Sequence, residues 1–433
     1  MRLSRVCIFA MCILLGALAN TRAAAQSPGL PTDRPLTLMD CINYAVTQHN
    51  SVRSAESDLT GSIADVKRAK SAYAPKFAVG SAFSSIGALA GTGNTGFLIA
   101  QGTDTLVTLS QSLYDGGRTQ TLIRQARAAR RSADADLELS IHERVLAVTT
   151  GYFNYLLAKR LADIAAQSVA ESQGQLELIQ ARIDAKDAAP VDIYPVEVQL
   201  ANAKLVKLQA DNDVRVAGNT LRNAIGLDRG PELKLVDVTE PSQGVPALED
   251  SLTKALLDRP EIVRSEAQLD SSKAALTLAR LQALPVPTAN AGYQQDLDGN
   301  DIGKEWTLGL GVSMSLFDGG ALAAGVTSAR ARVQSAVLTN AQLRKDISTE
   351  VEEAYLNLTN ALQRLEASRP SVTLAQKNLE VAREKYVQGM AIPLEIVNAQ
   401  LSYADAQASN AQSLYDSYIA RAQLDIAAGK RGY

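Results

Sequence analysis

Two very long stretches of the chain place apolar residues with the period of an α-helix. In the first, which starts after Gly117, apolar or alanine residues recur in steps of three and four. These positions are Leu122, Ala126, Ala129, Ala133, Leu137, Ile141, Val145, Val148, Tyr152 and Leu156. Such steps form one apolar stripe along a helix. The pattern predicts one helix from Gly117 to about Lys186 and another over 321–388, each roughly 100 Å long at about 1.5 Å per residue.

Shorter helical stretches of about 35 residues are predicted over 38–72 and 191–226. Each would reach roughly 52 Å, so two of them placed end to end would span one long helix. Helices of such length are typical of coiled coils and helical repeats. We therefore expect an extended antiparallel wall of helices, with no compact core around a single pocket.

Between these helices, the period of the apolar residues changes from 3.6 to 2. In the clearest segment, 306–316, every even position is apolar and every odd position is Thr, Gly or Ser. The pattern predicts two strands within about 76–114 and two within about 286–317. An apolar face opposite a small polar face fits a strand between lipid and an aqueous lumen. A half-buried strand of a soluble protein gives the same pattern, so for a single strand both interpretations stay open.

Four strands of about ten residues match the roughly 9–11 residues that a membrane strand needs. Four strands cannot close a membrane barrel, because the smallest have about eight. The chain must then oligomerise if these strands span a membrane. Two copies would give eight strands with a filled interior, whereas three would give twelve and leave room for water. The pattern favours three copies over two.

The chain is also an internal duplication. The sequence SLYDGG at 112–117 recurs as SLFDGG at 315–320, 203 residues later. The same offset aligns further pairs: Tyr152 with Tyr355, Pro190 with Pro393, Leu221 with Leu424, and Gly226 with Gly429. Upstream, Val52 aligns with Val263 at an offset of 211, and Pro75 with Pro285 at 210.

The duplication divides the chain into two repeats that share one architecture. We expect repeat 1 over 37–226, an inter-repeat linker or equatorial segment over 227–249, and repeat 2 over 250–433. Each repeat would contain a helix, two strands, a long helix and a return helix. A short N-terminal segment over 26–36 would precede the first repeat.

Composition narrows the class of protein. The 433 residues carry 43 Lys and Arg against 46 Asp and Glu, and the net charge of −3 argues against a nucleic-acid partner. After residue 20, no apolar run approaches the roughly 20 residues of a membrane helix. Residues 1–25 fit a signal peptide, with Arg2 and Arg5, an apolar core over 6–18, and small residues before Gln26. We therefore expect an exported protein in which Cys41 is the single remaining cysteine.

No catalytic or metal-binding pattern stands out. The two histidines, His49 and His142, have no neighbouring Cys or His at the spacing of metal ligands. The acidic segment 296–301 lacks the glycine and the final glutamate of a calcium loop. Nucleophile, nucleotide and dinucleotide motifs are not found either. The sequence predicts no catalytic residue, no metal and no cofactor.

The duplicated Tyr/Phe-Asp-Gly-Gly sequences, each followed by a long alanine-rich helix, resemble the TolC-like outer-membrane factors. The paired helix ends over 221–226 and 424–429 fit the same family, and the resemblance covers about 37–430. It implies an α+β membrane protein: a trimer with a 12-stranded transmembrane β-barrel, four strands per chain, in the cell outer membrane. A long periplasmic α-helical barrel, built from the two tandem repeats, would continue this barrel.

The resemblance also implies a function. Such a trimer is the outer-membrane exit duct of a tripartite efflux pump or a type I secretion system. It passively conducts substrates that a periplasmic adaptor (membrane fusion) protein and an inner-membrane pump or ABC transporter deliver. The expected partners are thus two further copies of the chain, the adaptor, the pump and outer-membrane lipid. Covalent chemistry is not expected.

The resemblance places the periplasmic tip of the duct at 184–195 and 386–398. Two acidic positions that narrow the closed duct in the family fall on Glu395 and Asn398, so one acid is replaced by an amide. The family's tip tyrosine and glycine match Tyr386 and Gly389. A locking arginine of some members falls on Ala391, so that link between helices should be absent. The family's gating mechanism therefore does not transfer directly.

Charge and backbone preferences also predict roles for the residues of the tip. Three symmetry-related Glu395 carboxylates on an axis would repel anions and favour cations, as acidic rings do in channels. The alternative is that Glu395 is solvated on the outer face of its helix. Asp192 is its equivalent in the first repeat. Pro190 and Pro393 fit helix starts, and with Gly389 they would form the tip turns that an adaptor contacts.

Two further groups of residues are notable. Asp115, Gly116 and Gly117, with their counterparts Asp318, Gly319 and Gly320, are expected at sharp turns from strand into helix. A basic cluster of Arg124, Arg127, Arg130 and Arg131 fits a solvated helix face, or part of the duct wall.

Two rival functions remain at this point. A soluble periplasmic coiled-coil adaptor would share the helical hairpins, but it would not need four lipid-compatible strands. An exported helical enzyme such as a hydrolase would need a catalytic constellation, which the sequence lacks.

Overall fold

The computed structural model describes residues 34–90, 96–112, 114–228, 230–238, 244–296, 304–314 and 317–430. The expected signal peptide over 1–25 lies outside the described residues, as does most of the acidic segment 296–301.

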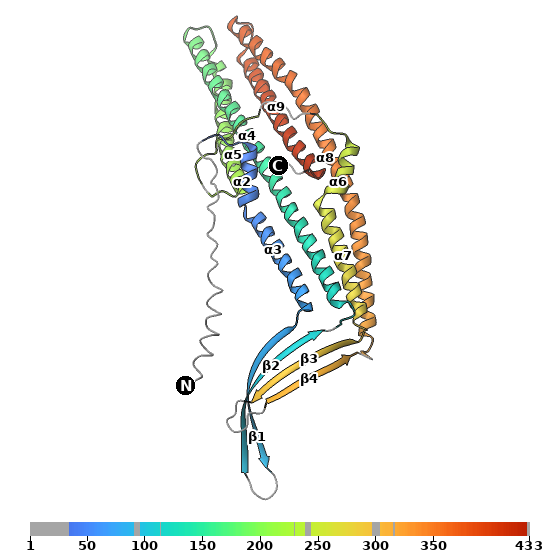
Figure 1. Ribbon diagram of the computed structural model, residues 1–433. Helices are drawn as coiled ribbons and strands as arrows, with labels where there is room; N and C mark the ends of the chain where they lie inside the picture. Colours follow the sequence, from blue (N-terminus) through green and yellow to red (C-terminus); the bar gives the residue numbers. More distant parts are fainter. Residues whose placement is uncertain are drawn as a thin grey trace.

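The helices form an elongated body with the sheet at one end (Figure 1). Helices α4 (Arg118–Asp184) and α8 (Ala321–Val387), of 67 residues each, run along its whole length. Shorter helices accompany them end to end: α3 (Asn50–Lys70) and α5 (Ile193–Ile225) lie along α4, and α7 (Pro260–Leu281) and α9 (Pro393–Ala427) lie along α8. The expected antiparallel wall of long and short helices is confirmed.

Each repeat starts with a short helix that the sequence pattern did not separate from the next one. These are α2 (Leu38–Gln48) and α6 (Leu248–Asp258). The prediction of one continuous helix over 38–72 is wrong, because the backbone is extended at His49, with φ −67° and ψ 134°. The tail of α3 also tightens into the 3₁₀ turn η1 (Ser71–Tyr73).

The two breaks, at His49 and Arg259, correct the alignment of the repeats. They lie 210 residues apart, which is the same offset as that between Pro75 and Pro285. Val52 therefore corresponds to Ile262 instead of Val263. Both residues are buried and follow the break by the same number of positions.

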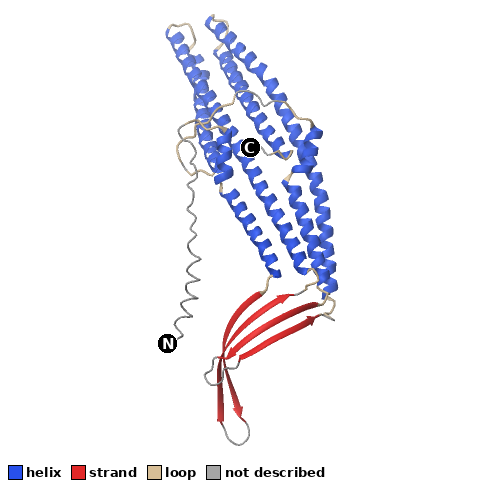
Figure 2. Ribbon diagram, viewed as in Figure 1, coloured by secondary structure: helices blue, strands red, loops and turns tan. Residues whose placement is uncertain are grey.

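The four strands form one antiparallel sheet in the order β1-β2-β3-β4 (Figure 2). Their bounds are β1 (Lys76–Ala90), β2 (Gly96–Ser112), β3 (Val286–Asp296) and β4 (Lys304–Ser313). One row of directly paired residues across the four strands is Val79, Val107, Tyr293 and Trp306, and a second is Phe77, Leu109, Ala291 and Leu308. Cross-strand partners share a face, so the register joins the alternate apolar positions of all four strands into one surface.

This apolar face is open to the surroundings of the chain. Leu308 and Leu310 are 86% and 81% exposed. The opposite face carries small polar or glycine positions such as Thr108, Gly292 and Thr307, which also pair directly. The alternation that the sequence showed in one strand therefore extends over the whole sheet.

Many of the described buried apolar residues gather in three separate clusters along the helices. One lies where α2, α4 and α5 meet and includes Tyr152 and Leu221; a second joins α6 to α8 and α9 around Leu358. The third lies at the far end, around Tyr386 and Ile396. No helix among the described residues combines the length and apolar character needed to cross a membrane.

Segment 230–238, within the expected linker, is fixed to the first cluster. The amide of Leu36 donates to the Lys234 carbonyl at 2.8 Å, and that of Val236 donates back to the Leu36 carbonyl at 3.0 Å. The Tyr152 hydroxyl donates to the carbonyls of Leu36 and Val236. The linker therefore lies tightly against the middle of the helical body.

Candidate functional site

Both repeats turn from strand into helix with the same hydrogen bonds. Asp115 accepts from the amides of Gly117 and Thr119 ahead of α4, and Asp318 accepts from those of Gly320 and Leu322 ahead of α8. These carboxylates satisfy amides that have no partner within the first helical turn. Burial alone would raise the pKa of Asp115, but the hydrogen bonds from Thr119 and Gly117 hold it below its usual value.

The glycine pairs at these junctions have backbone angles that other residues avoid. Gly116 and Gly117 have φ of 64° and 88°, and Gly319 and Gly320 have φ of 67° and 91°. Two successive left-handed residues are accessible mainly to glycine. The repeated Asp-Gly-Gly sequence is thus explained by a local turn, with one carboxylate that closes it.

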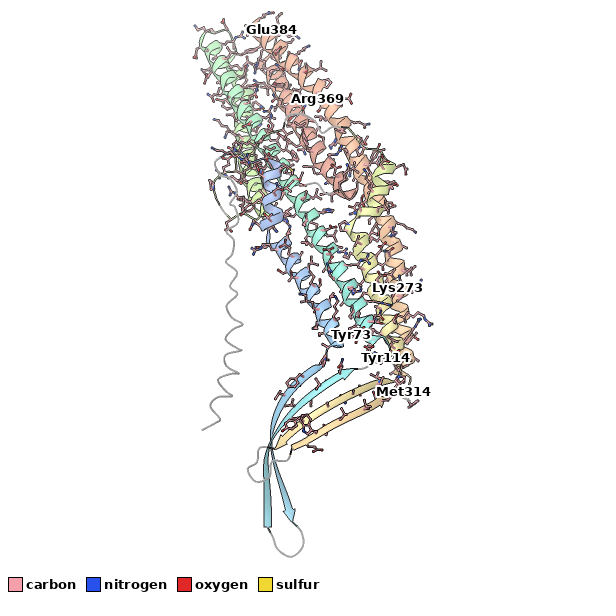
Figure 3. All side chains as sticks on the ribbon, in the orientation of Figure 1. Tyr73, Tyr114, Lys273, Met314, Arg369 and Glu384 are labelled. Carbon is pink, nitrogen blue, oxygen red and sulfur yellow. The ribbon has the colours of Figure 1, made fainter. Side chains whose placement is uncertain are left out.

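Aromatic side chains mark the same junctions. Tyr114 precedes Asp115 and is 66% exposed, and its counterpart Phe317 is 90% exposed. Tyr73, the last residue of η1 ahead of β1, is 57% exposed. Figure 3 places Tyr73, Tyr114 and Met314 at the border between the helices and the sheet. Exposed aromatic residues at the end of an apolar sheet face are typical of a membrane–water interface.

At the end opposite the sheet, two turns close the helical hairpins; we call this end the tip. The first turn contains the 3₁₀ turn η2 (Pro190–Asp192), and the second leads into Pro393 at the start of α9. Lys186 and Gly389, 203 residues apart, have φ of 62° and 74°. In each turn the next amide bonds back five residues: Asp187 to Arg182, and Met390 to Lys385, both at 2.8 Å. The two turns thus share one left-handed cap geometry.

Lys186 is the non-glycine residue with positive φ among those described. A side chain in this conformation costs about 1–2 kcal/mol. The first-repeat turn therefore carries a strain that the second avoids through Gly389.

Tyr386 lies inside the tip instead of at its surface. It is 3% exposed and packs in the cluster with Ile179, Val196 and Ile396. Its hydroxyl is buried without a hydrogen-bond partner among the described residues. Burial raises the pKa of Tyr386, although Arg182 acts in the opposite direction.

Arg182, from the last turn of α4, connects the two hairpins at this point. Its guanidinium donates to the Tyr386 carbonyl at 2.8 Å and lies 4.7 Å from the centre of the Tyr386 ring. A second arginine, Arg383 of α8, forms an ion pair of 3.1 Å with Glu171 of α4. Neither arginine was predicted from the sequence. Basic residues are favourable in the last turn of a helix, and the position of Arg182 near the predicted end of the first long helix was the feature that could have identified it.

The remaining predicted tip residues lie around this contact. Glu395 and Asn398 are exposed on neighbouring turns of α9, with Ile396 and Val397 buried beside them. Asp192 is half-buried, and its carboxylate acts to raise the pKa of Tyr386. The next residue, Ile193, packs against the cluster that contains Tyr386. The segment around Asp192 thus lies at this cluster, whereas Glu395 and Asn398 are exposed.

Two buried polar groups toward the tip, one on α4 and one on α9, lack hydrogen-bond partners among the described residues. Gln175 Nε2 and Gln400 Oε1 are buried without a partner among the described residues. Such a group costs about 1–3 kcal/mol when buried unpaired. The burial of these two groups is therefore unfavourable to the packing in this part of the helical body.

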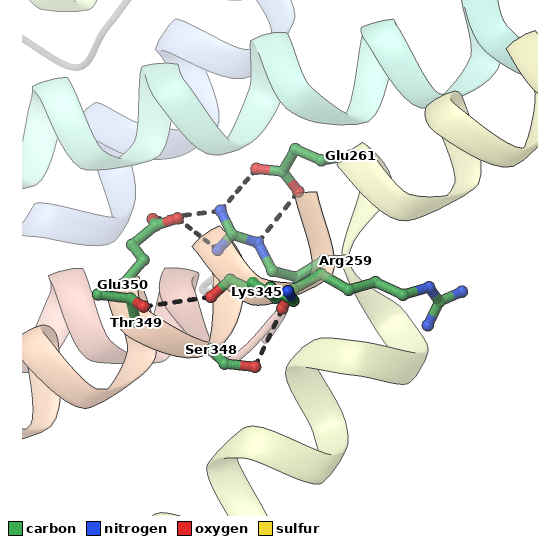
Figure 4. Close-up of polar contacts among 7 residues, drawn as sticks. Arg259, Glu261, Lys345, Ser348, Thr349 and Glu350 are labelled. Atoms are coloured by element: carbon green, nitrogen blue, oxygen red, sulfur yellow. Dashed lines mark hydrogen bonds and ion pairs between the residues drawn. The ribbon is translucent and has the colours of Figure 1, made fainter. Parts of the chain in front are cut away.

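Halfway along the body, the break at Arg259 holds a buried charge cluster (Figure 4). Arg259 bonds to Glu261 at 2.6 and 3.1 Å and to Glu350 of α8 at 2.7 and 3.2 Å. Its side chain is 6% exposed, against 53% for Glu350. Paired guanidinium and carboxylate groups of this geometry form strong, directional contacts. The cluster fixes the start of α7 against the middle of α8.

The glycines that end the return helices face these breaks. A Cβ on Gly226, where φ is 87°, would lie 3.0 Å from His49 Cδ2. A Cβ on Gly429, where φ is 75°, would lie 3.4 Å from the backbone nitrogen of Arg259. Backbone angle and close approach together explain the duplicated glycine at 226 and 429.

The family model for outer membrane efflux proteins matches residues 41–227 and 252–430, one segment in each repeat. The chain belongs to the outer membrane efflux protein family. It is thus an efflux channel protein of the outer membrane, and the alternative of a soluble periplasmic adaptor is not supported. The family consists of channels and not of enzymes.

Individual relatives agree in sequence and in fold. The chain is 23% identical to the outer membrane efflux protein BepC of Brucella suis over 75% of its own length and 71% of the relative. It is 21% identical to the outer membrane protein TolC of Escherichia coli over 90% and 82%. The outer membrane channel CmeC of Campylobacter jejuni superposes with a TM-score of 0.81 at 15% identity, over 90% of this chain and 85% of that one. The predicted fold class, with four strands and long helices in two tandem repeats, is confirmed.

Proposed function

We propose that three copies of this chain form one continuous exit duct, with twelve strands in the outer membrane and a periplasmic barrel of helices. The observation that carries the proposal is the open sheet. Within the described strands, β1 and β4 each have one unpaired edge, and the face built around Leu308 and Leu310 is uncovered. Unpaired edges in an apolar sheet are unfavourable unless other strands close them. Four strands are too few to close a barrel, and twelve leave an aqueous lumen.

The helices support the same closure. Helix α5 packs on α4, α4 on α9, and α9 on α8, which leaves α5 and α8 at the two sides of the tip half of the wall. Both outer helices expose apolar side chains: Leu205 and Leu208 of α5 are 64% and 66% exposed, and Leu374 and Val387 of α8 are 66% and 71% exposed. In a ring of three, α5 of one copy would cover α8 of the next.

The tip is the proposed gate of this duct. The Arg182–Tyr386 contact joins the hairpin of α4 and α5 to that of α8 and α9, so it favours the closed arrangement. The buried, unpaired Gln175 and Gln400 act against that arrangement. With these opposing contributions, the closed and open tips differ little in free energy, so the modest binding energy of a partner can shift the equilibrium between them.

The exposed tip residues receive two separate roles in the proposal. Glu395, with Asn398 one turn further, lines the narrow end and favours cations. The turns around Pro190, Gly389 and Pro393 present the tip to a periplasmic adaptor, which an inner-membrane pump or ABC transporter accompanies. In this assembly the chain conducts passively and catalyses no reaction.

Planar-bilayer recordings of the detergent-purified oligomer under a salt gradient test the gate and the ring. Arg182→Gln removes a hydrogen bond from a charged group, which is worth about 1.5–3 kcal/mol, so the closed-to-open ratio should fall by about tenfold to a hundredfold. Glu395→Gln should reduce cation selectivity, whereas Glu366→Gln, an exposed carboxylate away from the tip, should not.

Three results would contradict parts of the proposal. Unchanged opening in Arg182→Gln would reject the contact as a latch. Unchanged selectivity in Glu395→Gln would reject the ring but keep the duct. A monomeric mass in detergent, together with silence from both wild type and Arg182→Gln, would reject the trimeric duct.

A further inference from the structure

A basic groove lies between α4 and α7, and the proposed duct function makes no use of it. The groove has a volume of about 330 Å³, and its lining includes Arg124, Arg127 and Arg131 of α4 and Lys273 of α7. Its acidic lining residue is Asp270, which pairs with Arg131 at 3.2 Å and with Lys273 at 3.7 Å. Four cations therefore face a single carboxylate.

Two of the cations form no ion pair within the described part of the chain. No hydrogen bond or ion pair there joins Arg124 or Arg127 to an acid. Their spacing of three residues puts both on one face of α4, where like charges repel each other. The buried Ala128 and Ala274 also line the groove and are too small to fill it. The groove thus combines open volume with uncompensated positive charge.

The shared fold does not require this cluster. The positions 203 residues after Arg124, Arg127 and Arg131 are occupied by Thr327, Arg330 and Gln334. Two of the three charges are therefore missing from the equivalent turns of α8, although the two helices have the same length and the same start. The charge is specific to the α4–α7 groove.

The position of the groove limits what could bind there. Helix α4 begins at Arg118, six residues after the end of β2, and the run from Thr121 to Arg131 extends roughly 15 Å along it. Figure 3 shows Lys273 on the part of α7 that approaches the sheet. The groove therefore opens close to the membrane border marked by Tyr73 and Tyr114.

We propose that this groove binds a phosphate group. Guanidinium groups bind phosphate oxygens through paired, charge-assisted hydrogen bonds, and Lys273 adds a point charge. Two sources present this chemistry at that place: the headgroup of an anionic phospholipid, and a phosphate-bearing solute in the surrounding water.

Native mass spectrometry of the full-length oligomer in detergent tests the proposal with two lipids, phosphatidylglycerol and zwitterionic phosphatidylcholine. Wild type should retain phosphatidylglycerol in preference to phosphatidylcholine. The double variant Arg124→Gln/Arg127→Gln should bind phosphatidylglycerol about tenfold more weakly, as expected for the loss of charge-assisted hydrogen bonds. The matched control is Arg130→Gln, which removes the same charge from the same turn of α4 outside the groove lining and should behave as wild type.

Inorganic phosphate added to the wild-type complex separates the two sources. Displacement of phosphatidylglycerol by phosphate would assign the groove to free phosphate groups as well, and resistance to displacement would assign it to the lipid headgroup. Equal retention of the two lipids by wild type, or equal retention of phosphatidylglycerol by wild type and the double variant, would overturn the proposal. If the glutamine variant does not assemble, the wild-type preference between the two lipids decides.

Discussion

The breaks at His49 and Arg259 have nearly the same backbone angles but differ in their electrostatic contacts. Their φ and ψ are −67° and 134° in repeat 1 and −66° and 129° in repeat 2. At His49, the ring nitrogen Nδ1 accepts from the Ser51 amide at 3.1 Å and thereby caps α3. At Arg259, Pro260 starts α7, and the buried guanidinium binds two carboxylates.

The two repeats therefore share a backbone shape, but the contacts that stabilise it have diverged. In both repeats a glycine that ends the return helix packs against the break, so the available space is alike. Among the described residues, a hydrogen-bonded link from the break residue to the long helix is found in repeat 2, through Glu350. The position that corresponds to Glu350 in α4 is Ala147, which cannot form such a pair. Repeat 2 should therefore depend far more on its break residue than repeat 1 does.

The largest expected effect comes from removal of the two break residues. Arg259→Ala leaves Glu261 and Glu350 without a cation and should cost about 2–4 kcal/mol, toward the low end for buried pairs because Glu350 is half exposed. His49→Ala removes a cap and should cost about 1 kcal/mol. Unfolding in guanidinium chloride, at fixed protein and detergent concentration, measures the change in the free energy of unfolding for both variants.

Arg264→Ala is the matched control for the first of these variants. It breaks an ion pair with Asp136 in which both side chains are 48% exposed. Such pairs contribute about 0–1 kcal/mol. If Arg259→Ala costs no more than Arg264→Ala, the buried cluster does not stabilise repeat 2 as inferred.

A smaller effect distinguishes the two tip turns. Lys186→Gly should stabilise the first turn by about 1 kcal/mol, and Gly389→Ala should destabilise the second by about the same amount, because both positions are left-handed. Hydrogen exchange of the amides that follow each turn, Asp187 and Met390, reports these changes locally. Lys186→Ala keeps the unfavourable backbone angle and removes the charge, so it should behave like wild type. A gain in protection in Lys186→Ala equal to that in Lys186→Gly would assign the effect to charge.

Periodicity was sufficient to predict the long helices and the alternating strands. It also determined which strand residues share a face, because a slip of one residue would turn the apolar side of a strand toward the lumen. The register that pairs Val107 with Tyr293 and Tyr293 with Trp306 agrees with the alternation in each strand.

The same periodicity concealed the breaks between helices. On either side of His49, Ala45 and Val52 are buried at helical spacing, and no proline or glycine lies between them. Only Pro260 in repeat 2 marked the position, since a residue before proline avoids the helical region. The sequence offered offsets of 210 and 211 for this part of the repeats, and the structure shows that 210 transfers the boundary to repeat 1.

The contact between Arg182 and Tyr386 at the tip could not be predicted from the sequence for a different reason. Arg182 and Tyr386 are 204 residues apart, and they meet because the two hairpins pack against each other at the tip. The tyrosine was singled out by resemblance, but its partner was not. For Glu395 and Asn398, the structure gives exposure on one side of α9, and their place in a pore stays a prediction.

The smallest expected effect separates the two breaks by pH. Burial lowers the pKa of His49 below its usual value of 6.5, and Arg144 acts in the same direction. The unfolded chain then binds more protons than the folded one as pH falls through 6.5, so the contribution of His49 to stability is lost at mildly acidic pH.

The pKa of Glu261 also lies below its usual value of 4.5, because the hydrogen bonds with Arg259 outweigh burial. Its contribution should persist to more acidic pH and be lost only as pH falls below 4.5. The quantity to measure is the unfolding midpoint of wild type minus that of His49→Gln, since titrating groups that do not interact with His49 cancel in the difference. This difference should shrink between pH 7.5 and 5, whereas the matching difference for Glu261→Gln should stay constant over that range. A constant difference for His49→Gln would mean that its folded pKa is not lowered, and the electrostatic contrast between the two breaks would then rest on Arg259 alone.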